Sequence, residues 1–306
     1  VLIISLVVGF GWWVNNQIIY YILAMAFGLL SLLVWRSHNR IGVWFRLGFI
    51  AVGGFLCGGL PFWVYNVKYD FASFGIFHLA SVQDAFRHLR DFFSIAMPIV
   101  LGARRDWETS DIYPYASTLV GGVYAFLLLG FLWFRRKHLI ALLRLRLDFE
   151  SPLEIFIVFL VGIGAVFSMS SFGSLAESPR YILPAYTGIF VISAWVIAQL
   201  CVQSRLGGVL LGSAMVCINI ASCYFGGRGL PGEPFVFEGQ RVDKDHAKLL
   251  EWLAAHGYSF VRTNYWIGYR LAFESHEEVR FVVFGEPAQV RIQAYEKAGS
   301  ALGIDC

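Results

Sequence analysis

Long apolar runs constrain this chain more than any other feature of its sequence. Six of them approach the roughly 20 residues that a helix needs to cross the hydrocarbon of a bilayer. They cover residues 17–35, 47–65, 116–134, 153–171, 181–200 and 206–224, and a shorter run at 1–11 has the length of part of a span. Because a segment in hydrocarbon has to satisfy its own backbone polar groups, we expect each run to be helical.

Composition supports the same class of protein. Hydrophobic residues make up 58% of the chain and charged residues 15%, and the mean hydropathy is +0.63, whereas about 25% of the residues of ordinary soluble domains are charged. We therefore expect an all-α polytopic membrane bundle over residues 1–224, followed by a small C-terminal α/β soluble domain over residues 225–306. Val1 lies within an apolar run without a basic n-region, so we expect no signal peptide and a start within a longer protein.

The positions of the basic residues predict an orientation. Lysine and arginine gather in three loops, which hold Arg36, Arg40 and Arg46, then Arg135, Arg136, Lys137, Arg144 and Arg146, and finally Arg205. The positive-inside rule makes these loops cytoplasmic, and threading the six spans alternately places all three on one face. The opposite, outer face then carries the turn at 11–16, the segment 66–115, the hairpin at 177–184 and everything after Phe225.

The outer segment 66–115 contains an amphipathic pattern. Apolar residues recur at helical spacing from Val82 to Met97, and charged or polar residues fill the other face. This pattern predicts a helix in the membrane interface. Two interpretations stay open, a helix that only packs on the outer ends of the spans and a helix that borders a groove for a lipid substrate.

A charge cluster follows this helix. It begins with Arg104 and Arg105 and includes Asp106, Trp107 and Glu108. Most clusters of this kind are solvated surface, and the alternative is that the two arginines contact a phosphate.

The last 82 residues have a different character. They are more charged, they begin with a hinge rich in glycine and proline at 226–232, and no apolar run reaches span length. Helical patterns at 243–256 and 265–273 alternate with short strand patterns at 259–262 and 279–284. This alternation predicts a compact α/β unit.

The sequence holds no motif of a soluble enzyme, whether a phosphate-binding glycine loop, a nucleophile elbow or a pair of zinc-binding cysteines. Asp243, Asp245 and His246, or His276 with its acidic neighbours, are more typical of a polar surface than of a metal site. No cofactor is therefore predicted, although a divalent metal stays possible. The net charge of +3 comes mainly from the cytoplasmic loops and argues against a nucleic-acid partner.

The hairpin between the fourth and fifth full spans is the strongest candidate for a functional site. Pro179 and Pro184 restrict the backbone around Arg180 and Tyr181. A guanidinium held at the membrane boundary suits a phosphate or pyrophosphate, and Glu177 is placed to orient it. The alternative is that Arg180 extends to lipid headgroups or pairs with Glu177 for structure alone.

The hairpin also carries a family resemblance. Residues 178–184, Ser-Pro-Arg-Tyr-Ile-Leu-Pro, resemble the arginine-tyrosine-x-x-proline hairpin of bacterial membrane glycosyltransferases of the GT-C class, the family 39-type group of protein mannosyltransferases and aminoarabinose transferases. The turn at 11–16, the glycine-proline run at 59–66 that ends in Tyr-Asn, and the tyrosine-tryptophan segment at 264–271 are similar to parts of these proteins. The chain resembles the C-terminal part of such an enzyme.

The resemblance implies a reaction and a location. A polyprenyl-phosphate sugar donor gives its sugar to an acceptor on the outer face of a bacterial plasma membrane, with membrane lipid as surroundings and the C-terminal domain extracytoplasmic. Arg180 is the first candidate to bind the lipid phosphate, Tyr181 and Glu177 assist it, and Arg104 and Arg105 are second candidates. The catalytic acid of the family lies in a loop that would precede Val1, so no residue is assigned to that role.

Two other functions stay open. A transporter or flippase for a lipid-linked sugar usually shows internal repeats and ionisable groups within the membrane. The sequence has no evident repeat, and Glu154 is the one acid within the apolar runs, near an end. A non-catalytic membrane scaffold is the second alternative, because an aromatic outer helix also suits a binding partner.

Overall fold

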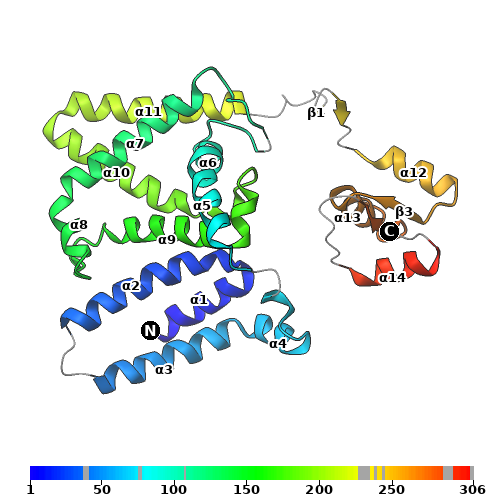
Figure 1. Cartoon of the computed structure of the whole chain (residues 1–306), viewed down its shortest axis with the longest axis horizontal. Helices are drawn as coiled ribbons and strands as arrows, with labels where there is room; N and C mark the ends of the chain where they lie inside the picture. The colour runs from blue at the N-terminus through cyan, green and yellow to red at the C-terminus, as the bar shows by residue number, and fades with distance from the viewer. Residues whose placement is uncertain are drawn as a thin grey trace. The chain divides into compact units, whose positions relative to one another are not determined.

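The structure is a computed structural model that describes residues 1–36, 41–74, 78–106, 108–226, 235–237, 240–242, 245–284 and 292–303. The chain divides into two compact units, Val1–Gly226 and Gly227–Cys306, and each is treated by itself. The described residues are mostly helical (Figure 1). Of the expected hinge at 226–232, only Gly226 lies within the described residues.

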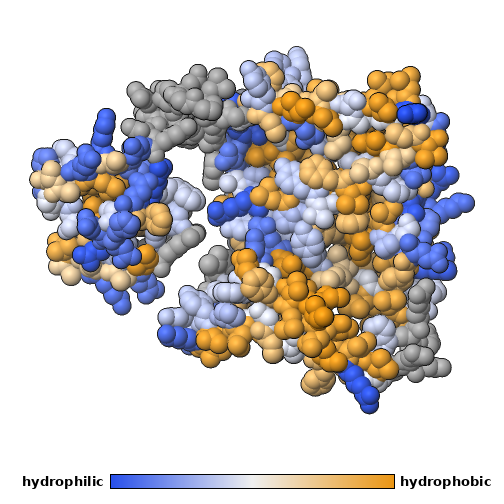
Figure 2. Space-filling view, turned by 180° about the vertical axis from the view of Figure 1, so that it is seen from behind, coloured by the Kyte–Doolittle hydropathy of each residue, from blue (hydrophilic) through white to orange (hydrophobic). Residues whose placement is uncertain are grey.

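Four helices of the first unit are long and apolar enough to cross a membrane, and they indicate an integral membrane protein. They are α2 (Ile19–Arg36), α7 (Ala116–Phe134), α10 (Ala185–Gln203) and α11 (Arg205–Gly226). Hydrophobic side chains cover much of the visible surface of this unit (Figure 2). Such a surface suits contact with lipid better than contact with water.

The apolar run at 47–65 differs from a single straight span. It folds as α3 (Ile41–Gly58) and α4 (Leu60–Lys68), which are bent by 70° at Gly59. Pro61 lies in the first turn of α4, where its missing N–H leaves no gap in the hydrogen bonding, whereas in a continuous helix its ring would clash with the preceding turn. Glycine and proline therefore place the bend.

The run at 153–171 also forms a shorter helix than expected. Its helix, α9 (Ile155–Met169), has 15 residues and is roughly 22 Å long at 1.5 Å per residue, against about 30 Å of hydrocarbon. The chain then leaves the helix at Ser170 and continues in a short 3₁₀ turn, Ser171–Leu175. The hairpin therefore begins about one turn earlier than a full span would place it.

Helix α1 (Leu2–Val14) packs on α3 through residues without bulky side chains. A Cβ atom on Gly9 would lie 2.1 Å from the carbonyl oxygen of Phe55, and a Cβ atom on Gly58 would lie 2.1 Å from the carbonyl oxygen of Leu6. These positions allow the two backbones to touch, as in the small-xxx-small contacts of membrane helices. Ser5 fills the equivalent position opposite Gly54.

Helices α2, α5 (Val82–Asp91) and α10 pack on α9, and α7 and α11 pack on α10. The buried residues Phe159, Ile163 and Phe167 of α9 share one hydrophobic cluster with the segment formed by α5, a π-helical turn (Phe92–Ala96) and α6 (Met97–Val100). A second cluster joins α7 to α10. In Figure 1 the α5–α6 segment crosses the spans instead of running along them.

The single apolar face expected for this outer helix is divided in two by the fold. Phe92 and Ala96 face the core together with His88, which the apolar pattern did not include. Val82, Phe86, Leu89 and Phe93 form a second, exposed apolar stripe. The helix thus packs on the spans along one side and leaves another apolar side uncovered by the described residues.

A buried ion pair joins the C-terminal end of α7 to the N-terminal end of α9. The Arg135 guanidinium donates to a carboxylate oxygen of Glu154, and its Nη2 donates to the Ser151 carbonyl oxygen at 2.8 Å. The side chains are only 11% and 1% exposed. Arg135 also lies over the ring of Trp195 in α10, with its Cζ 5.8 Å from the centroid. One charged pair therefore connects three helices.

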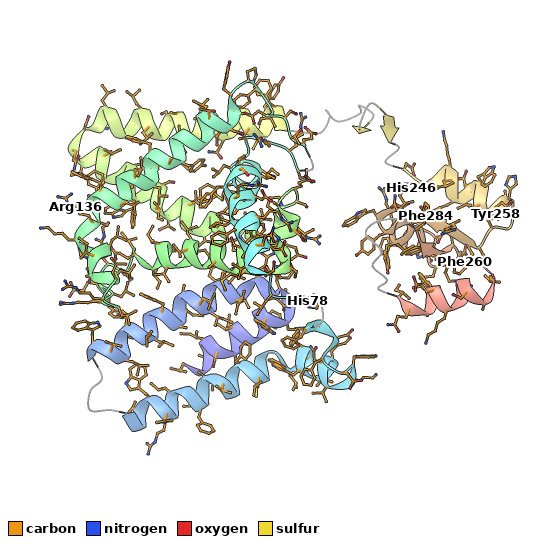
Figure 3. All side chains as sticks on the ribbon, viewed as in Figure 1. His78, Arg136, His246, Tyr258, Phe260 and Phe284 are labelled. Atoms are coloured by element: carbon orange, nitrogen blue, oxygen red, sulfur yellow. The ribbon has the colours of Figure 1, made fainter. Side chains whose placement is uncertain are left out.

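The first unit has two distinct ends in Figure 1. Helix α8 (Arg136–Leu142) and the turn between α10 and α11 lie at one end, here called the arginine-rich end, where Arg136 is labelled in Figure 3. The turn between α9 and α10 lies at the other, here called the hairpin end. At the arginine-rich end, the indole N–H of Trp35 donates a hydrogen bond to the Arg144 carbonyl oxygen at 3.2 Å. Arg40 lies outside the described residues.

The second unit is a small α/β fold. Its strands β3 (Phe260–Thr263) and β4 (Arg280–Val283) pair in parallel, with Phe260 opposite Arg280, and α13 (Tyr265–Glu274) makes the crossover that a parallel pair requires. The other described elements are α12 (Ala247–Ala255), α14 (Gln293–Ala301) and the antiparallel pair β1 (Phe235–Phe237) and β2 (Gln240–Val242). Gly268 and Gly299 allow α13 and α14 to approach Phe281 and Val282 of β4.

The close contact between α1 and α3 yields a test. Replacing Gly58 by valine forces the backbones apart, and we expect the free energy of unfolding to fall by about 1–3 kcal/mol, as for other overpacked sites. Thermal unfolding in detergent measures the loss. Gly53→Val is the matched control on the same helix, because a Cβ atom there meets nothing within 4 Å. Equal midpoints for the two variants would contradict this account of the packing.

Candidate functional site

The hairpin between α9 and α10 is built from two short 3₁₀ turns, Ser171–Leu175 and Arg180–Ile182. The prolines at its start and end keep the chain out of a continuous helix. Pro179 and Ile182 are buried, whereas the intervening Arg180 is exposed. The buried neighbours therefore hold the backbone while the guanidinium stays at the surface.

Helix α5 packs against the hairpin. The imidazole of His88 in α5 fills the space beside Gly173, where any Cβ atom would lie 2.2 Å from the ring. Its Nδ1 donates to the Ser168 carbonyl oxygen at 3.2 Å. The backbone N–H of Ser171 also donates to the carbonyl oxygen of His78, labelled in Figure 3, at 2.9 Å. These contacts fix the hairpin to α5 and to the segment that precedes α5.

Arg180 has aromatic rather than acidic surroundings. Its Nη2 lies 3.2 Å from the Tyr181 hydroxyl, and its Cζ lies 5.1 Å from the centre of the Tyr181 ring. Tyr181 in turn stacks on Phe172 with ring centres 4.3 Å apart. A cation over an aromatic face is weakly attracted but keeps its charge, so this environment orients the guanidinium without neutralising it.

Glu177 does not act as the ionic partner of Arg180 in this structure. Its side chain is exposed, and within the described part of the chain no carboxylate approaches the Arg180 guanidinium to within 4 Å. The backbone is held instead, because Gln17 donates from Nε2 to the Arg180 carbonyl oxygen at 3.0 Å. Arg180 therefore presents an uncompensated positive charge at the hairpin end.

Arg104 is engaged with the protein. Pro98 has no N–H to donate to the Ser94 carbonyl oxygen, and the Nη1 of Arg104 donates to that oxygen at 3.2 Å. The Nε of Arg104 also pairs with Asp111 at 2.9 Å. This arginine thus completes the hydrogen bonding of the helix α6 region and folds the loop that leads to α7.

Arg105 closes the end of α11. Its Nε and Nη2 donate to the carbonyl oxygens of Gly226 and Phe225 at 3.2 and 2.7 Å, and its Nη1 pairs with Glu108 at 3.2 Å. A cation is favoured at the C-terminus of a helix, where carbonyl groups lack partners. Of the three arginines proposed to bind phosphate, only Arg180 leaves its charge without a carboxylate or carbonyl acceptor among the described residues.

An apolar groove begins at Tyr21 and Thr187 and extends to Leu147 and Pro152 in the loop before α9. It has a volume of about 350 Å³ and runs between α2 and α9, with Ala24 and Gly28 on one side and Phe156 and Phe159 on the other. A hydrogen bond of 2.9 Å between the hydroxyls of Tyr21 and Thr187 lies at its border. Tyr21 is one helical turn from Gln17, whose side chain holds Arg180, so the groove starts close to the hairpin.

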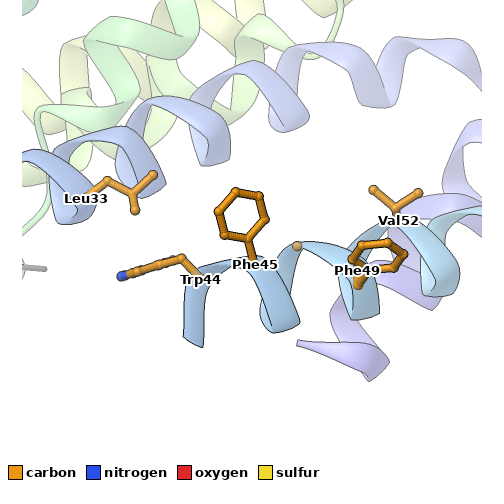
Figure 4. A pocket seen from close by; sticks show the side chains of 6 residues that line it. Leu33, Trp44, Phe45, Phe49 and Val52 are labelled. Carbon is orange, nitrogen blue, oxygen red and sulfur yellow. The ribbon is translucent and has the colours of Figure 1, made fainter. Parts of the chain in front are cut away.

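A second apolar groove, of about 460 Å³, separates α2 from α3 (Figure 4). It is lined by Leu33, Trp44, Phe45, Gly48, Phe49 and Val52. Phe49 is 82% exposed, and none of the lining residues is charged. This groove has the properties of a lipid-facing surface and offers no group that would select a substrate.

Metal ligands do not gather in the described residues. They contain no cluster of three histidine, cysteine, aspartate or glutamate residues that could hold an ion. His246 lies 3.3 Å from Glu274 of α13, which also pairs with Arg270. Asp243, the third residue of the group considered from the sequence, lies outside the described residues.

No protein-family model, curated protein or solved structure matches this chain. The fold by itself defines a mostly helical protein with four helices long and apolar enough to span a membrane and a small α/β unit.

Sequence reasoning did not identify His88 or the groove beside α9 as parts of this site. A histidine within an amphipathic pattern gives no signal of burial, because its contact with Gly173 joins segments 85 residues apart. The groove is likewise formed by helices that are distant in the sequence. Its lining residues are indistinguishable from other apolar positions in the same runs.

The Asp111 contacts predict a dependence of stability on pH. Burial alone raises the pKa of the Asp111 carboxyl, but hydrogen bonds from Ser117 and Arg104 outweigh it and hold the pKa below its usual range. A lowered pKa in the folded state stabilises the protein above the ordinary aspartate pKa, and this contribution disappears as the pH falls through the folded-state value.

We therefore expect Asp111→Asn to lower the midpoint of thermal unfolding at neutral pH and to reduce the fall of this midpoint as the pH drops below about 4. Glu177→Gln, at an exposed carboxylate of the same end, should leave both quantities unchanged. Identical pH profiles for wild type and Asp111→Asn would show that the Asp111 contacts do not contribute.

Proposed function

We propose that the hairpin end binds the phosphate of a polyprenyl-linked substrate and that the protein is a membrane glycosyltransferase of the GT-C type. The observation that carries this proposal is the open charge of Arg180, oriented by Tyr181 and paired with no carboxylate among the described residues. A charged group kept without an ionic partner beside membrane-spanning helices is typical of a functional site. A forked guanidinium matches phosphate oxygens in geometry and charge.

The groove supports the same ligand. A phosphate at Arg180 would leave its prenyl chain next to an apolar channel of about 350 Å³ that begins near Tyr21 and continues along α2 and α9. Burial of prenyl carbons there contributes roughly 25 cal/mol for each Å² removed from water. Charge at one end and a long apolar surface beyond it are the two features of a polyprenyl phosphate.

The exposed stripe of α5 supports the orientation. Val82, Phe86, Leu89 and Phe93 lie on the segment that crosses the spans, and they face the outer leaflet in our proposal. The hairpin end is then the outer face of a bacterial plasma membrane, the arginine-rich end is cytoplasmic, and the C-terminal unit is extracytoplasmic.

The chemistry follows from these positions. The acceptor hydroxyl attacks the anomeric carbon of the sugar, the bond between that carbon and the phosphate oxygen breaks, and the acceptor proton passes to a base. Arg180 stabilises the negative charge that the departing polyprenyl phosphate gains, which lowers the barrier more than it stabilises the bound donor. The base is not assigned to a residue of this chain.

Arg180 is tested first by ligand binding. We expect Arg180→Ala to weaken the binding of decaprenyl phosphate to the protein in nanodiscs by roughly 10- to 100-fold, the value of one or two charge-assisted hydrogen bonds. Arg180→Lys should bind with intermediate affinity, because it keeps the charge and loses the fork. Arg87→Ala is the control, since Arg87 is exposed and pairs with Asp84 at 2.8 Å. Equal affinities for wild type and Arg180→Ala would refute the phosphate site.

Transfer separates the enzyme from a flippase or scaffold. Proteoliposomes that contain a polyprenyl-phosphate sugar and an acceptor should form glycosylated acceptor with wild type and lose this product with Arg180→Ala. Movement of the donor across the bilayer without product would favour the flippase.

The groove is tested by a substitution that fills it. We expect Gly28→Leu to weaken the binding of decaprenyl phosphate, because the leucine side chain would occupy the groove that Gly28 lines, and to leave the binding of the short geranyl phosphate unchanged. The leucine fits there, since the nearest atom to a Cβ at Gly28 among the described residues is a Leu147 methyl group 4.0 Å away. Gly122→Leu on α7 is the control, since nothing lies within 4 Å of its Cβ position. Equal losses for both ligands would mean that the groove does not hold the prenyl chain.

A further inference from the structure

Three aromatic side chains form an exposed stack on the second unit. Trp252 of α12 lies 4.3 Å from His256 and 5.7 Å from Tyr258, measured between ring centres. The three ring planes are parallel to within 27°, and those of His256 and Tyr258 to within 11°. Trp252 and Tyr258 are 51% and 52% exposed, so about half of each side chain stays open to a ligand although each has a stacked neighbour.

The stack is fixed by the way α12 ends. Trp252 and His256 are four residues apart and share one face of the helix, and His256 Nδ1 lies 2.8 Å from the Trp252 carbonyl oxygen. Gly257 then adopts φ of +71°, which glycine tolerates, and the Tyr258 N–H donates to the Leu253 carbonyl oxygen at 2.9 Å. This turn returns Tyr258 to Trp252 and preorganises the rings before any ligand arrives. Figure 3 shows Tyr258 just beyond the end of α12.

The charge and polarity of the residues around the stack indicate which ligands it can bind. The exposed charges nearest to it on α12 are Lys248 and Glu251, which have opposite signs. A nucleic acid would require a positive field for its phosphates, and this helix face does not supply one. Lipid insertion would require a mainly aliphatic exposed face, whereas the exposed residues of α12 mix Leu249 and Ala255 with the charged Lys248 and Glu251.

We propose that the Trp252, His256 and Tyr258 stack binds a neutral carbohydrate chain. The apolar C–H face of a pyranose ring packs flat on an aromatic ring, while its hydroxyl groups point to the rim and accept or donate hydrogen bonds there. The Tyr258 hydroxyl and His256 Nε2 are polar groups of the stack itself, and the exposed Lys248 lies one helical turn before Trp252 on the same face. The site is independent of the phosphate site at Arg180, which belongs to the other unit.

The test uses the full chain in nanodiscs and an array of neutral oligosaccharides, including maltohexaose, cellohexaose and mannotetraose, followed by calorimetry with the strongest binder. We expect binding by wild type, a loss of roughly fivefold to tenfold in affinity for Trp252→Ala and for Tyr258→Ala, and retention by Trp252→Phe. Trp266→Ala is the matched control, because Trp266 is 59% exposed on the same unit but stands at 82° to its neighbour Tyr265.

Three outcomes would overturn the proposal. The first is that no neutral oligosaccharide binds, and the second is that Trp252→Ala and Trp266→Ala lose affinity equally. The third is quenching by doxyl-labelled lipids of a fluorophore attached at Trp252→Cys, which would place the rings in the bilayer. Because Arg180→Ala should leave oligosaccharide binding unchanged, failure of this site and failure of the phosphate site are distinguishable.

Discussion

The ion pair between Arg135 and Glu154 is the interaction on which the arrangement of the first unit depends. A carboxylate that is 1% exposed requires a partner, because an unpaired charge at such a site costs several kcal/mol. Arg135 supplies that partner from the end of α7 and lies over Trp195 of α10. The pair therefore fixes three helices relative to one another at the arginine-rich end, and the removal of either charge would leave the other buried and uncompensated.

Because α9 is short, fixing its first residues at Glu154 also limits where the hairpin at its other end can lie. The helix starts directly after Glu154 and ends at Met169, roughly 22 Å away, so its two ends cannot both lie beyond about 30 Å of hydrocarbon. Glu154 lies within the protein and is neutralised there. In our proposal the hairpin at the other end lies near the lipid headgroups, where the phosphate of a lipid-linked substrate would be found. The contact of His88 with Gly173 holds the hairpin that carries Arg180 against α5.

The arginines of the chain divide according to what they contact. Arg104 satisfies a carbonyl group that Pro98 leaves without a donor, Arg105 closes the end of α11, and Arg135 neutralises Glu154. Each has a structural acceptor nearby. Arg180 has an aromatic neighbour instead, which directs the guanidinium and leaves its charge open. This difference in partners, rather than the presence of arginine in a loop, distinguishes a candidate ligand site from a folding contact.

From the sequence alone we predict helices over the long apolar runs, a membrane protein and an α/β unit in the last residues, because these follow from local hydrophobic periodicity and from the requirement that backbone groups in hydrocarbon be paired. It also predicted the hairpin, since prolines interrupt an otherwise apolar run. The bend of α3 and α4 at Gly59, and the division of the outer helix into one buried and one exposed apolar side, come from the tertiary structure. So does the finding that no acidic group among the described residues pairs with Arg180. These properties depend on contacts between segments far apart in the chain, such as His88 with Gly173 and Gln17 with Arg180. Local residue patterns carry no record of such contacts, because an apolar or charged residue has the same sequence signal whichever neighbour the fold brings to it.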